Sequence, residues 1–318
     1  MLTLPDFKEK QILFIRAERG VKNKIKFEND NIVFLKDDAV ANKASCHKVF
    51  AVFIIGDMTI TTGILREARK LGVSFSFLKN NFNSYASVGA VAQGNYLLRS
   101  AQYTMGEEKE MVIAKNLVAN KIRNQAALLR EKKADCQIMD KMNGLEQAVS
   151  SASANSELLG IEGNASRIFF GEYFKDHKWL RRSPRTRQDT TNFLMDIGYT
   201  ILFNFADSLL NLYGFDTYKG AYHKLFFQRK SLSCDIVEPF RCIIDRQIAK
   251  SFNLKQINEK DFEFIGGKYE LDYNKSQKYA QIFMEAIMDK KEDIYLFVQG
   301  FYRYFMDDKK YQFPDFKI

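Results

Sequence analysis

The chain has 318 residues, with 48 Lys or Arg against 39 Asp or Glu, so its formal net charge at pH 7 is +9. This length allows a large core and two domains, and the positive excess favours a polyanionic partner. Four scattered cysteines without a Cys-x-x-Cys pair exclude a disulfide framework and argue against a zinc site. No apolar run is long enough to cross a bilayer and residues 1–10 lack a secretory-signal pattern, so we predict a cytoplasmic protein that does not bind membranes.

The first part of the chain is predicted to be mostly β-structure. Short runs rich in Ile, Val and Phe, separated by turn-forming residues, predict strands at 11–17, 24–27, 32–35, 48–55 and 74–78. The apolar spacing of residues 61–71 predicts a helix before the last strand. We expect these elements to form a small β-rich dimerisation domain over residues 1–85, because exposed strand edges can pair between chains.

The rest of the chain is predicted to be helical. Residues 79–93, rich in Asn, Ser and Gly, are predicted to be a linker. Beyond them apolar residues recur at steps of three and four, which predicts helices at 107–133, 140–159, 161–174, 189–213, 235–252 and 279–305. The predicted fold class is therefore α+β, with a larger all-helical domain over residues 86–318, in which the candidate catalytic residues described next all lie. The last dozen residues are expected to fray.

The segment 220–246 carries the strongest chemical pattern. It holds His223, one of three histidines, followed by Asp235 and Glu238, which would share one face of a helix. An imidazole beside two carboxylates, with Arg and Lys close by in sequence, could hold a divalent metal that acts on a phosphodiester. The same two acids ahead of an apolar run also match a helix capping box, and their spacing alone leaves both interpretations open.

Two further stretches are candidates for function. Glu162 opens a predicted helix, where an acid can also serve only as a partner of the helix dipole. Residues 178–187 contain five cations, no acid and Trp179, which is the composition of a phosphate-binding segment with a base-stacking ring, or of a solvated face. Candidate DNA-contacting residues are Arg181, Arg182, Arg185, Arg187, Arg229, Lys230 and Arg241. Arg241 could instead pair with Asp245.

The motifs occur together in the order of a known family. The string H-x₇-S-L-x-x-D-x-x-E-P-F-R, from His223 to Arg241, resembles the signature of the CRISPR-associated integrase, which inserts new spacers. Glu162 begins EGNASRIFF, which is similar to the second motif of that family. Residues 121–125, 192–199 and 216–223 resemble further family segments. One departure is the turn before the histidine, which reads Gly-Ala-Tyr-His where the family usually has Gly-Phe-Leu-His.

The resemblance implies a metal-dependent DNA endonuclease and integrase. It implies that Glu162, His223 and Glu238 coordinate Mg²⁺ or Mn²⁺, with Asp235 at the edge of the site as a water-mediated or alternate ligand. The implied substrates are double-stranded DNA, namely the spacer precursor, whose 3′-OH attacks, and the repeat array. The implied partners are a second copy of the chain and a small ferredoxin-like adaptation subunit. The alternatives are a structure-specific nuclease of repair or transposition and a non-catalytic DNA-binding scaffold.

Overall fold

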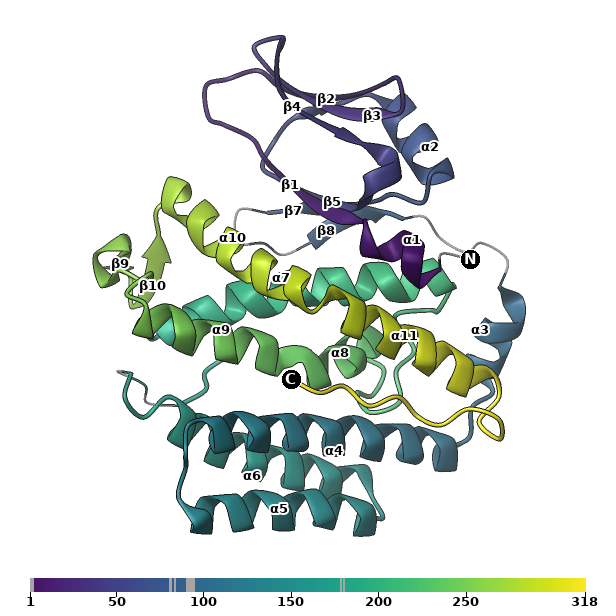
Figure 1. Ribbon diagram of the computed structural model, residues 1–318, viewed down its shortest axis with the longest axis vertical. Coiled ribbons are helices and arrows are strands. Elements are labelled where there is room, and N and C mark those ends of the chain that lie inside the picture. The colour runs from purple at the N-terminus through teal and green to yellow at the C-terminus, as the bar shows by residue number, and fades with distance from the viewer. Residues whose placement is uncertain (1–2, 80–81, 83, 90–94, 178, 180) are drawn as a thin grey trace. The chain divides into compact units, whose positions relative to one another are not determined.

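The computed structural model describes residues 3–79, 82, 84–89, 95–177, 179 and 181–318 (Figure 1). The chain forms two compact units, which are described separately. The first comprises Met1–Arg99 and Asn204–Phe215, and the second Ser100–Phe203 and Asp216–Ile318. The domain boundary predicted at residues 85 and 86 stays a prediction.

The first unit is built on two four-stranded sheets. One sheet has the order β1 (Gln11–Arg16), β5 (Val49–Ile55), β7 (Ser74–Leu78), β8 (Ser84–Val88). The other has the order β4 (Ala39–Ser45), β3 (Asn31–Lys36), β2 (Asn23–Glu28), β6 (Thr59–Ile60). In the first sheet β1, β5 and β7 are parallel and β8 is antiparallel. The helices α1 (Leu4–Lys8) and α2 (Thr62–Lys70) also belong to this unit, as do residues 204–213 of the long helix α7 (Thr190–Tyr213).

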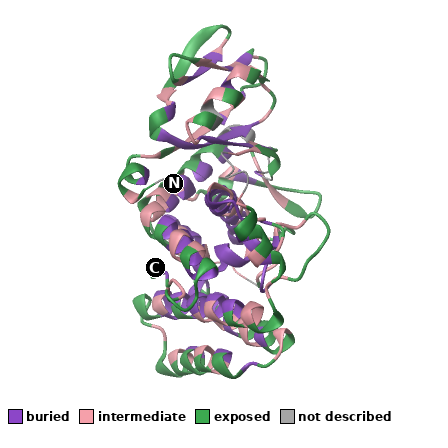
Figure 2. Cartoon of the chain, turned by 90° about the vertical axis from the view of Figure 1, so that its right-hand side faces the viewer, coloured by how far each residue is buried: buried purple, intermediate pink, exposed green. Residues whose placement is uncertain are grey.

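The two sheets and α2 share one apolar core. Strand β5 is apolar and buried at every position, as expected for a central strand covered on both faces. Its Val52 and Ile54 belong to the same buried cluster as Ile25 of β2, Phe34 of β3 and Ile64 of α2. Figure 2 shows such buried positions in purple and the exposed positions in green.

Strands β4, β6 and β8 were not predicted. Strand β4 reads AVANKAS and is mostly exposed, so it has no apolar alternation, and its backbone pairing with β3 decides its structure. Strand β8 lies inside the predicted linker, where it pairs with β7. Residues 80–81, 83 and 90–93 of that predicted linker lie outside the described residues.

From residue 96 the regular secondary structure of the described chain is helical apart from one hairpin. The helices are α3 (Tyr96–Tyr103), α4 (Glu107–Glu131), α5 (Cys136–Ser151), α6 (Asn155–Tyr173), α7 (Thr190–Tyr213), α8 (Ser231–Val237), α9 (Arg241–Asn253), α10 (Tyr273–Asp289) and α11 (Lys291–Met306). The short 3₁₀ turn η2 (Glu238–Phe240) joins α8 to α9. In the second unit α4 packs against α5, α6, α9 and η2 (Figure 1). The predicted fold class is confirmed.

Several predicted helix limits are wrong. The predicted helix at 140–159 is interrupted at residues 152–154, so α6 begins at Asn155 and Glu162 lies in its interior. The predicted helix at 235–252 begins earlier, at Ser231, and is broken by η2. The predicted helix at 279–305 is two helices, because Lys290 leaves the helical conformation between α10 and α11.

The hairpin of β9 (Phe262–Ile265) and β10 (Lys268–Leu271) was also missed. Its turn is Gly266–Gly267, both with positive φ, which glycine adopts without steric cost. Helix α7 is long and apolar enough to cross a membrane by length and composition, but 83% of its most apolar window is buried, as in a core helix.

The expectation that the last residues fray is wrong. Asn120 of α4 donates its side-chain amide to the carbonyl of Phe316 at 2.8 Å and accepts the Phe316 N–H at 3.0 Å. Asn124 donates to the same carbonyl at 2.9 Å. The Phe316 ring is buried edge-on against Phe240, with the ring centroids 4.9 Å apart. The C-terminal tail is therefore fixed on α4 beside η2.

Candidate active site

Helices α4 and α6 and the turn η2 bring three charged side chains to one point. Lys121 of α4 donates from Nζ to Glu162 Oε1 of α6 and, at 2.6 Å, to Glu238 Oε2 of η2. The Lys121 and Glu238 side chains are 9% and 6% exposed, and that of Glu162 is 19% exposed. Ser166, one turn after Glu162, donates to Glu162 Oε1 at 3.0 Å. Two acids that lie 76 positions apart in the numbering therefore share one ammonium group.

The charges at this point stabilise one another. Burial alone would lower the pKa of Lys121, but the Glu238 and Glu162 carboxylates outweigh burial and raise it. Burial alone would raise the pKa of Glu238, but Arg241 and Lys121 outweigh burial and lower it to about 2. Both Lys121 and Glu238 are therefore charged at neutral pH.

Arg241 is fixed next to Glu238 rather than next to Asp245. Its Nη2 lies 2.9 Å from Glu238 Oε1, and its guanidinium lies over the Tyr199 ring at 4.8 Å from the centroid. Asp245 instead accepts a hydrogen bond of 2.5 Å from the Tyr199 hydroxyl. Arg241 can therefore orient a site carboxylate, a role that the sequence argument did not consider.

His223 is oriented by Asp235, which is completely buried. Asp235 Oδ2 accepts the backbone N–H groups of Ala221 and Tyr222 at 2.7 and 3.0 Å, and Oδ1 accepts that of His223 at 2.8 Å. Asp235 Oδ1 also lies 2.6 Å from His223 Nδ1. Because a carboxylate can only accept, Nδ1 carries the proton and Nε2 is left for a ligand or a substrate.

These contacts exclude two of the alternatives for the site acids. Asp235 lies inside α8, whose N-cap is Lys230, so Asp235 and Glu238 do not form a capping box. Glu162 lies in the interior of α6, so it is not a partner of a helix N-terminus. The four contacts of Asp235 instead support a positioning role for it, and its predicted role as a water-mediated or alternate ligand stays a prediction.

The present geometry does not form a complete metal-binding group. Within the described part of the chain, no three His, Cys, Asp or Glu side chains lie close enough to hold a metal ion. One cause is visible: the Lys121 ammonium lies between Glu162 and Glu238. The donor types nevertheless fit a divalent cation, because Mg²⁺ and Mn²⁺ prefer carboxylate oxygens and Mn²⁺ accepts an imidazole.

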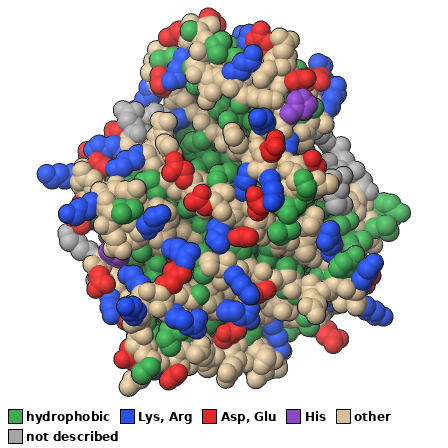
Figure 3. Space-filling view, viewed as in Figure 1, with side chains coloured by type: hydrophobic (Ala, Val, Ile, Leu, Met, Phe, Trp, Pro, Cys, Tyr) green, Lys and Arg blue, Asp and Glu red, His purple; other side chains and the backbone are tan. Residues whose placement is uncertain are grey.

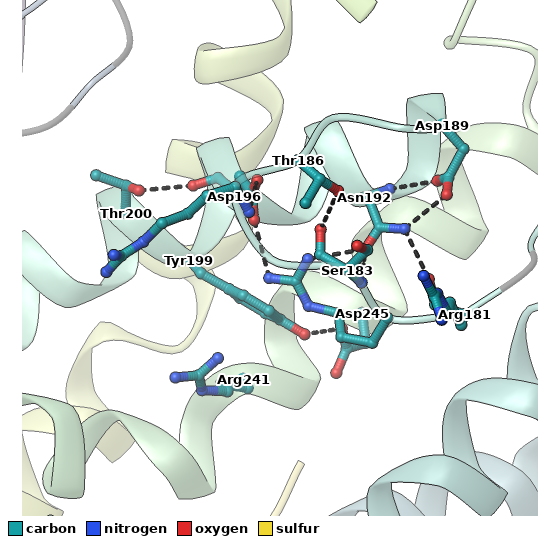
Figure 4. A network of polar contacts seen from close by, with 12 residues as sticks. Arg181, Ser183, Thr186, Asp189, Asn192, Asp196, Tyr199, Thr200, Arg241 and Asp245 are labelled. Carbon is teal, nitrogen blue, oxygen red and sulfur yellow. Dashed lines mark hydrogen bonds and ion pairs between the residues drawn. The ribbon is translucent and has the colours of Figure 1, made fainter. Parts of the chain in front are cut away.

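The predicted DNA-contacting arginines have different environments, and Figure 4 labels two of them, Arg181 and Arg241. Arg182 is used internally: it donates to Asn192 Oδ1 at 2.8 Å and pairs with Asp196 at 2.9 Å. The Arg187 guanidinium lies 4.8 Å from the centroid of the Phe193 ring. Arg181 and Arg185 are exposed.

The other residues of the basic segment 178–187 that were expected to contact DNA are Trp179 and Lys178. The Trp179 ring packs on Phe170 and Phe174, with centroid separations of 5.6 and 5.7 Å, so these contacts argue against its predicted stacking on a base. Lys178 lies outside the described residues. On the face shown in Figure 3, Lys and Arg side chains are interspersed with Asp and Glu.

The comparison with known families is decisive for the identity of the chain. The family model described as CRISPR associated protein Cas1 matches residues 20–285. The chain belongs to the Cas1 family. It is 30% identical over 275 residues to the CRISPR-associated endonuclease Cas1 1 of Thermodesulfovibrio yellowstonii, a match that covers 81% of this chain and 86% of the relative. The predicted family resemblance is confirmed.

Solved structures share the fold. A Cas1 protein from Thermotoga maritima superposes with a TM-score of 0.81 at 20% identity, covering 94% of this chain and 98% of that chain. A casposase bound to its integration product gives a TM-score of 0.78 at 18% identity, covering 94% and 92%. A chain of a partial Cas6-RT-Cas1–Cas2 complex gives 0.70 at 24% identity, covering 97% and 99%. At these identities the likeness shows the fold.

The sequence argument placed Lys121 and Tyr199 in the family-like segments 121–125 and 192–199 but did not name either as a site residue. The sequence did contain a signal for Lys121. It lies one helical turn after Leu117 and Val118, so it shares their apolar helix face, which is otherwise suited to a core. A lysine in such a face needs an acidic partner when it is buried. Tyr199 gave no such signal, since an aromatic residue in an apolar helix is usually only part of the core.

Proposed function

We propose that the protein is a metal-dependent DNA endonuclease and integrase of CRISPR adaptation. The observations that carry this proposal are that Glu162 and Glu238, from separate elements of a Cas1-family chain, contact the same cation, and that Asp235 orients His223. The reaction is attack of a spacer 3′-OH on a phosphodiester of the repeat array. A new P–O bond forms to the spacer 3′ oxygen, and the P–O bond to the 3′ oxygen of the repeat strand breaks. The attacking hydroxyl gives its proton to solvent or a base, and the leaving oxygen takes up a proton to become a hydroxyl. With water as the nucleophile the same site cleaves DNA.

The residues that would hold the ion are Glu162, His223 through Nε2, and Glu238. A bound Mg²⁺ or Mn²⁺ would lower the pKa of the attacking hydroxyl and offset negative charge on the phosphate oxygens. The role of Asp235 is to fix the tautomer and orientation of His223. The role of Arg241 is to fix Glu238 and to keep it ionised.

The partners of the reaction are proposed from the same family. The chain acts on double-stranded DNA, both the spacer precursor and the repeat array. It works as a homodimer, with the first unit supplying strand edges for the contact. A small ferredoxin-like subunit of the Cas2 type bridges two dimers, which agrees with the likeness to a chain of the Cas6-RT-Cas1–Cas2 complex.

A strand-joining assay tests the proposal. Purified protein is incubated with Mn²⁺, a short duplex bearing 3′-OH ends and a supercoiled plasmid that carries a repeat array. We expect Glu162→Gln, Glu238→Gln and His223→Ala each to lower the joining rate on the order of 100-fold or more, with DNA affinity nearly unchanged. Glu172→Gln, in the same helix as Glu162 but paired with Lys175, is the control and should join normally.

Two other results would contradict the proposal. If the wild type only cleaves branched DNA and never joins strands, the protein is a structure-specific nuclease. If Mn²⁺ neither supports any reaction nor raises the melting temperature, the protein is a DNA-binding scaffold.

A further inference from the structure

The last residues of the chain lie on α4 next to the candidate active site. Helix α11 ends at Met306, and the chain beyond it forms no helix or strand (Figure 1, yellow). We call residues 313–318 the tail segment. Its position on α4 is set by side chains of that helix, because it has no regular secondary structure of its own.

Two asparagines of α4 bind the backbone of the tail segment. Asn120 pairs with both the N–H and the carbonyl of Phe316, and Asn124 donates to the same carbonyl. Asn124 also accepts the Ile318 N–H at 3.1 Å. The two side chains are 2% and 3% exposed, and burying an amide is costly unless it is hydrogen-bonded. These bonds therefore specify one position for the tail segment, which apolar contacts alone would not do.

The tail segment also contacts η2, the turn whose first residue is Glu238. The Asn124 amide donates to the Pro239 carbonyl at 3.1 Å as well as to the Phe316 carbonyl at 2.9 Å, so one side chain joins η2 to the tail segment. The Phe240 ring is completely buried, and the Phe316 ring packs edge-on against it. Both contacts engage residues that directly follow Glu238.

The turn η2 cannot fix its own position. It has three residues in a 3₁₀ conformation, whose hydrogen-bond geometry is poorer than that of an α-helix, and its middle residue, Pro239, has no N–H to donate. Neighbouring elements must therefore hold it. On α11 the Phe297 ring lies 5.0 Å from the Phe240 centroid, and the other side of the contact is supplied by α4 and the tail segment. A shift of η2 would move the Glu238 carboxylate relative to Glu162.

We propose that the tail segment holds η2 on α4 and so fixes the Glu238 carboxylate for metal binding. Asn120, Asn124 and Phe316 are then positioning residues, which act on Glu238 through η2. This inference rests on the proposed function for the role of Glu238, but the hold on η2 can be measured without metal or DNA.

Hydrogen exchange of the full chain in EDTA tests the hold on η2. The variants Asn120→Ala and Phe316→Ala each remove a contact of the tail segment and leave Glu238 and its charged partners in place. We expect the amides of residues 237–242 to exchange on the order of tenfold faster in both variants, because η2 then separates from α4 more often. Asn116→Ala is the matched control, one turn earlier in α4. Its side chain donates to the carbonyl of Val112 in its own helix, so its loss should leave this exchange unchanged.

Calorimetry with Mn²⁺ and no DNA tests the consequence for the site. The dissociation constant of Mn²⁺ should rise about tenfold in Asn120→Ala and Phe316→Ala, as is typical when a residue that orients a metal ligand is lost. DNA cleavage by these variants should then recover at high Mn²⁺ concentration, since excess metal fills the weakened site. A variant that is only partly folded would instead lose cleavage at every Mn²⁺ concentration.

Phe262→Ala is the control for loss of stability alone. It removes a buried ring of the second unit that packs on Phe193 and Tyr279. Its melting temperature should fall as that of Phe316→Ala does, because both variants lose a buried ring. Its dissociation constant for Mn²⁺ and the exchange of residues 237–242 should stay those of the wild type.

Three results would overturn the inference. Unchanged exchange of residues 237–242 in both tail variants would show that the other contacts of η2 suffice to hold it. Faster exchange with an unchanged dissociation constant for Mn²⁺ would show that the tail segment serves stability alone. A changed oligomeric state with normal exchange and normal Mn²⁺ binding would assign the tail segment to a contact between chains. The proposed function fails separately, if the wild type neither joins nor cleaves DNA, because the exchange measurement requires neither reaction.

Discussion

At the scale of single residues, the site depends on one lysine in an unusual place. Lys121 is 7% exposed, and its ammonium is shared by Glu162 and Glu238. Two buried carboxylates at one point repel each other unless a cation lies between them. Lys121 therefore provides, in the present structure, the positive charge that a divalent ion would also provide.

The substitution Lys121→Met tests this role. The methionine keeps the length of the side chain but leaves the two carboxylates without a cation, so we expect the unfolding free energy without metal to fall by about 3 kcal/mol. Mn²⁺ should then raise the melting temperature of the variant more than that of the wild type. The control is Lys115→Met, six residues earlier in α4, whose ammonium donates to the Ser150 carbonyl. If Mn²⁺ raised the melting temperatures of Lys121→Met and of the wild type by the same amount, this role of Lys121 would be contradicted.

At the scale of elements, the turn before His223 has to lie directly against α8. A Cβ added at Gly220 would lie 2.6 Å from Asp235 Oδ2 and 2.9 Å from the Ser231 carbonyl carbon. Both distances are too short for a real carbon atom, and the nearby backbone cannot move away as a flexible side chain could. Only glycine permits Asp235 to receive the three backbone N–H groups of residues 221–223.

We therefore expect Gly220→Ala to misplace His223. The rate of DNA cleavage should fall at least about tenfold, as is typical when the partner that orients a functional histidine is displaced. Gly163→Ala is a close control, because it adds the same methyl group beside Glu162 but has no neighbouring atom within 4 Å of the added Cβ. This control should keep its activity, and its stability should rise by up to about 1 kcal/mol, because alanine favours a helix interior more than glycine does. Unchanged cleavage by Gly220→Ala would show that the turn can relax without moving His223.

The elements also show what a sequence can predict. Strand β5 and helix α4 were predicted because their apolar spacing decides their structure, whereas β4 depends on pairing with β3 and carries no pattern of its own. The motifs identified the site acids Glu162, Asp235 and Glu238, but they did not predict which groups these acids contact. That Asp235 would bind the 221–223 backbone depends on how a loop returns to α8, which residue spacing alone does not specify.

At the scale of the whole molecule, a buried polar network couples stability to pH. Arg182 and Arg241 lie on the Tyr199 ring, and the Tyr199 hydroxyl donates to Asp245 (Figure 4). Burial raises the pKa of Asp245 from 3.8 to about 7, against the lowering effects of the Tyr199 hydrogen bond and of the arginines. Between pH 3.8 and about pH 7, Asp245 is protonated in the folded protein but ionised in the unfolded chain. The stability from Asp245 is thus complete below the lower pKa and is lost as the pH rises through the higher one.

The variant Asp245→Asn removes this titration and keeps the size of the side chain. Its unfolding free energy relative to the wild type should therefore increase by roughly 2.5 kcal/mol between about pH 5 and about pH 8. Urea unfolding at the two pH values measures the change. Asp140→Asn, at an exposed position of α5, is the control and should show a nearly constant difference. If the Asp245→Asn difference is also constant, Asp245 is ionised throughout this range, and Arg182 and Arg241 stabilise its negative charge more strongly than burial disfavours it.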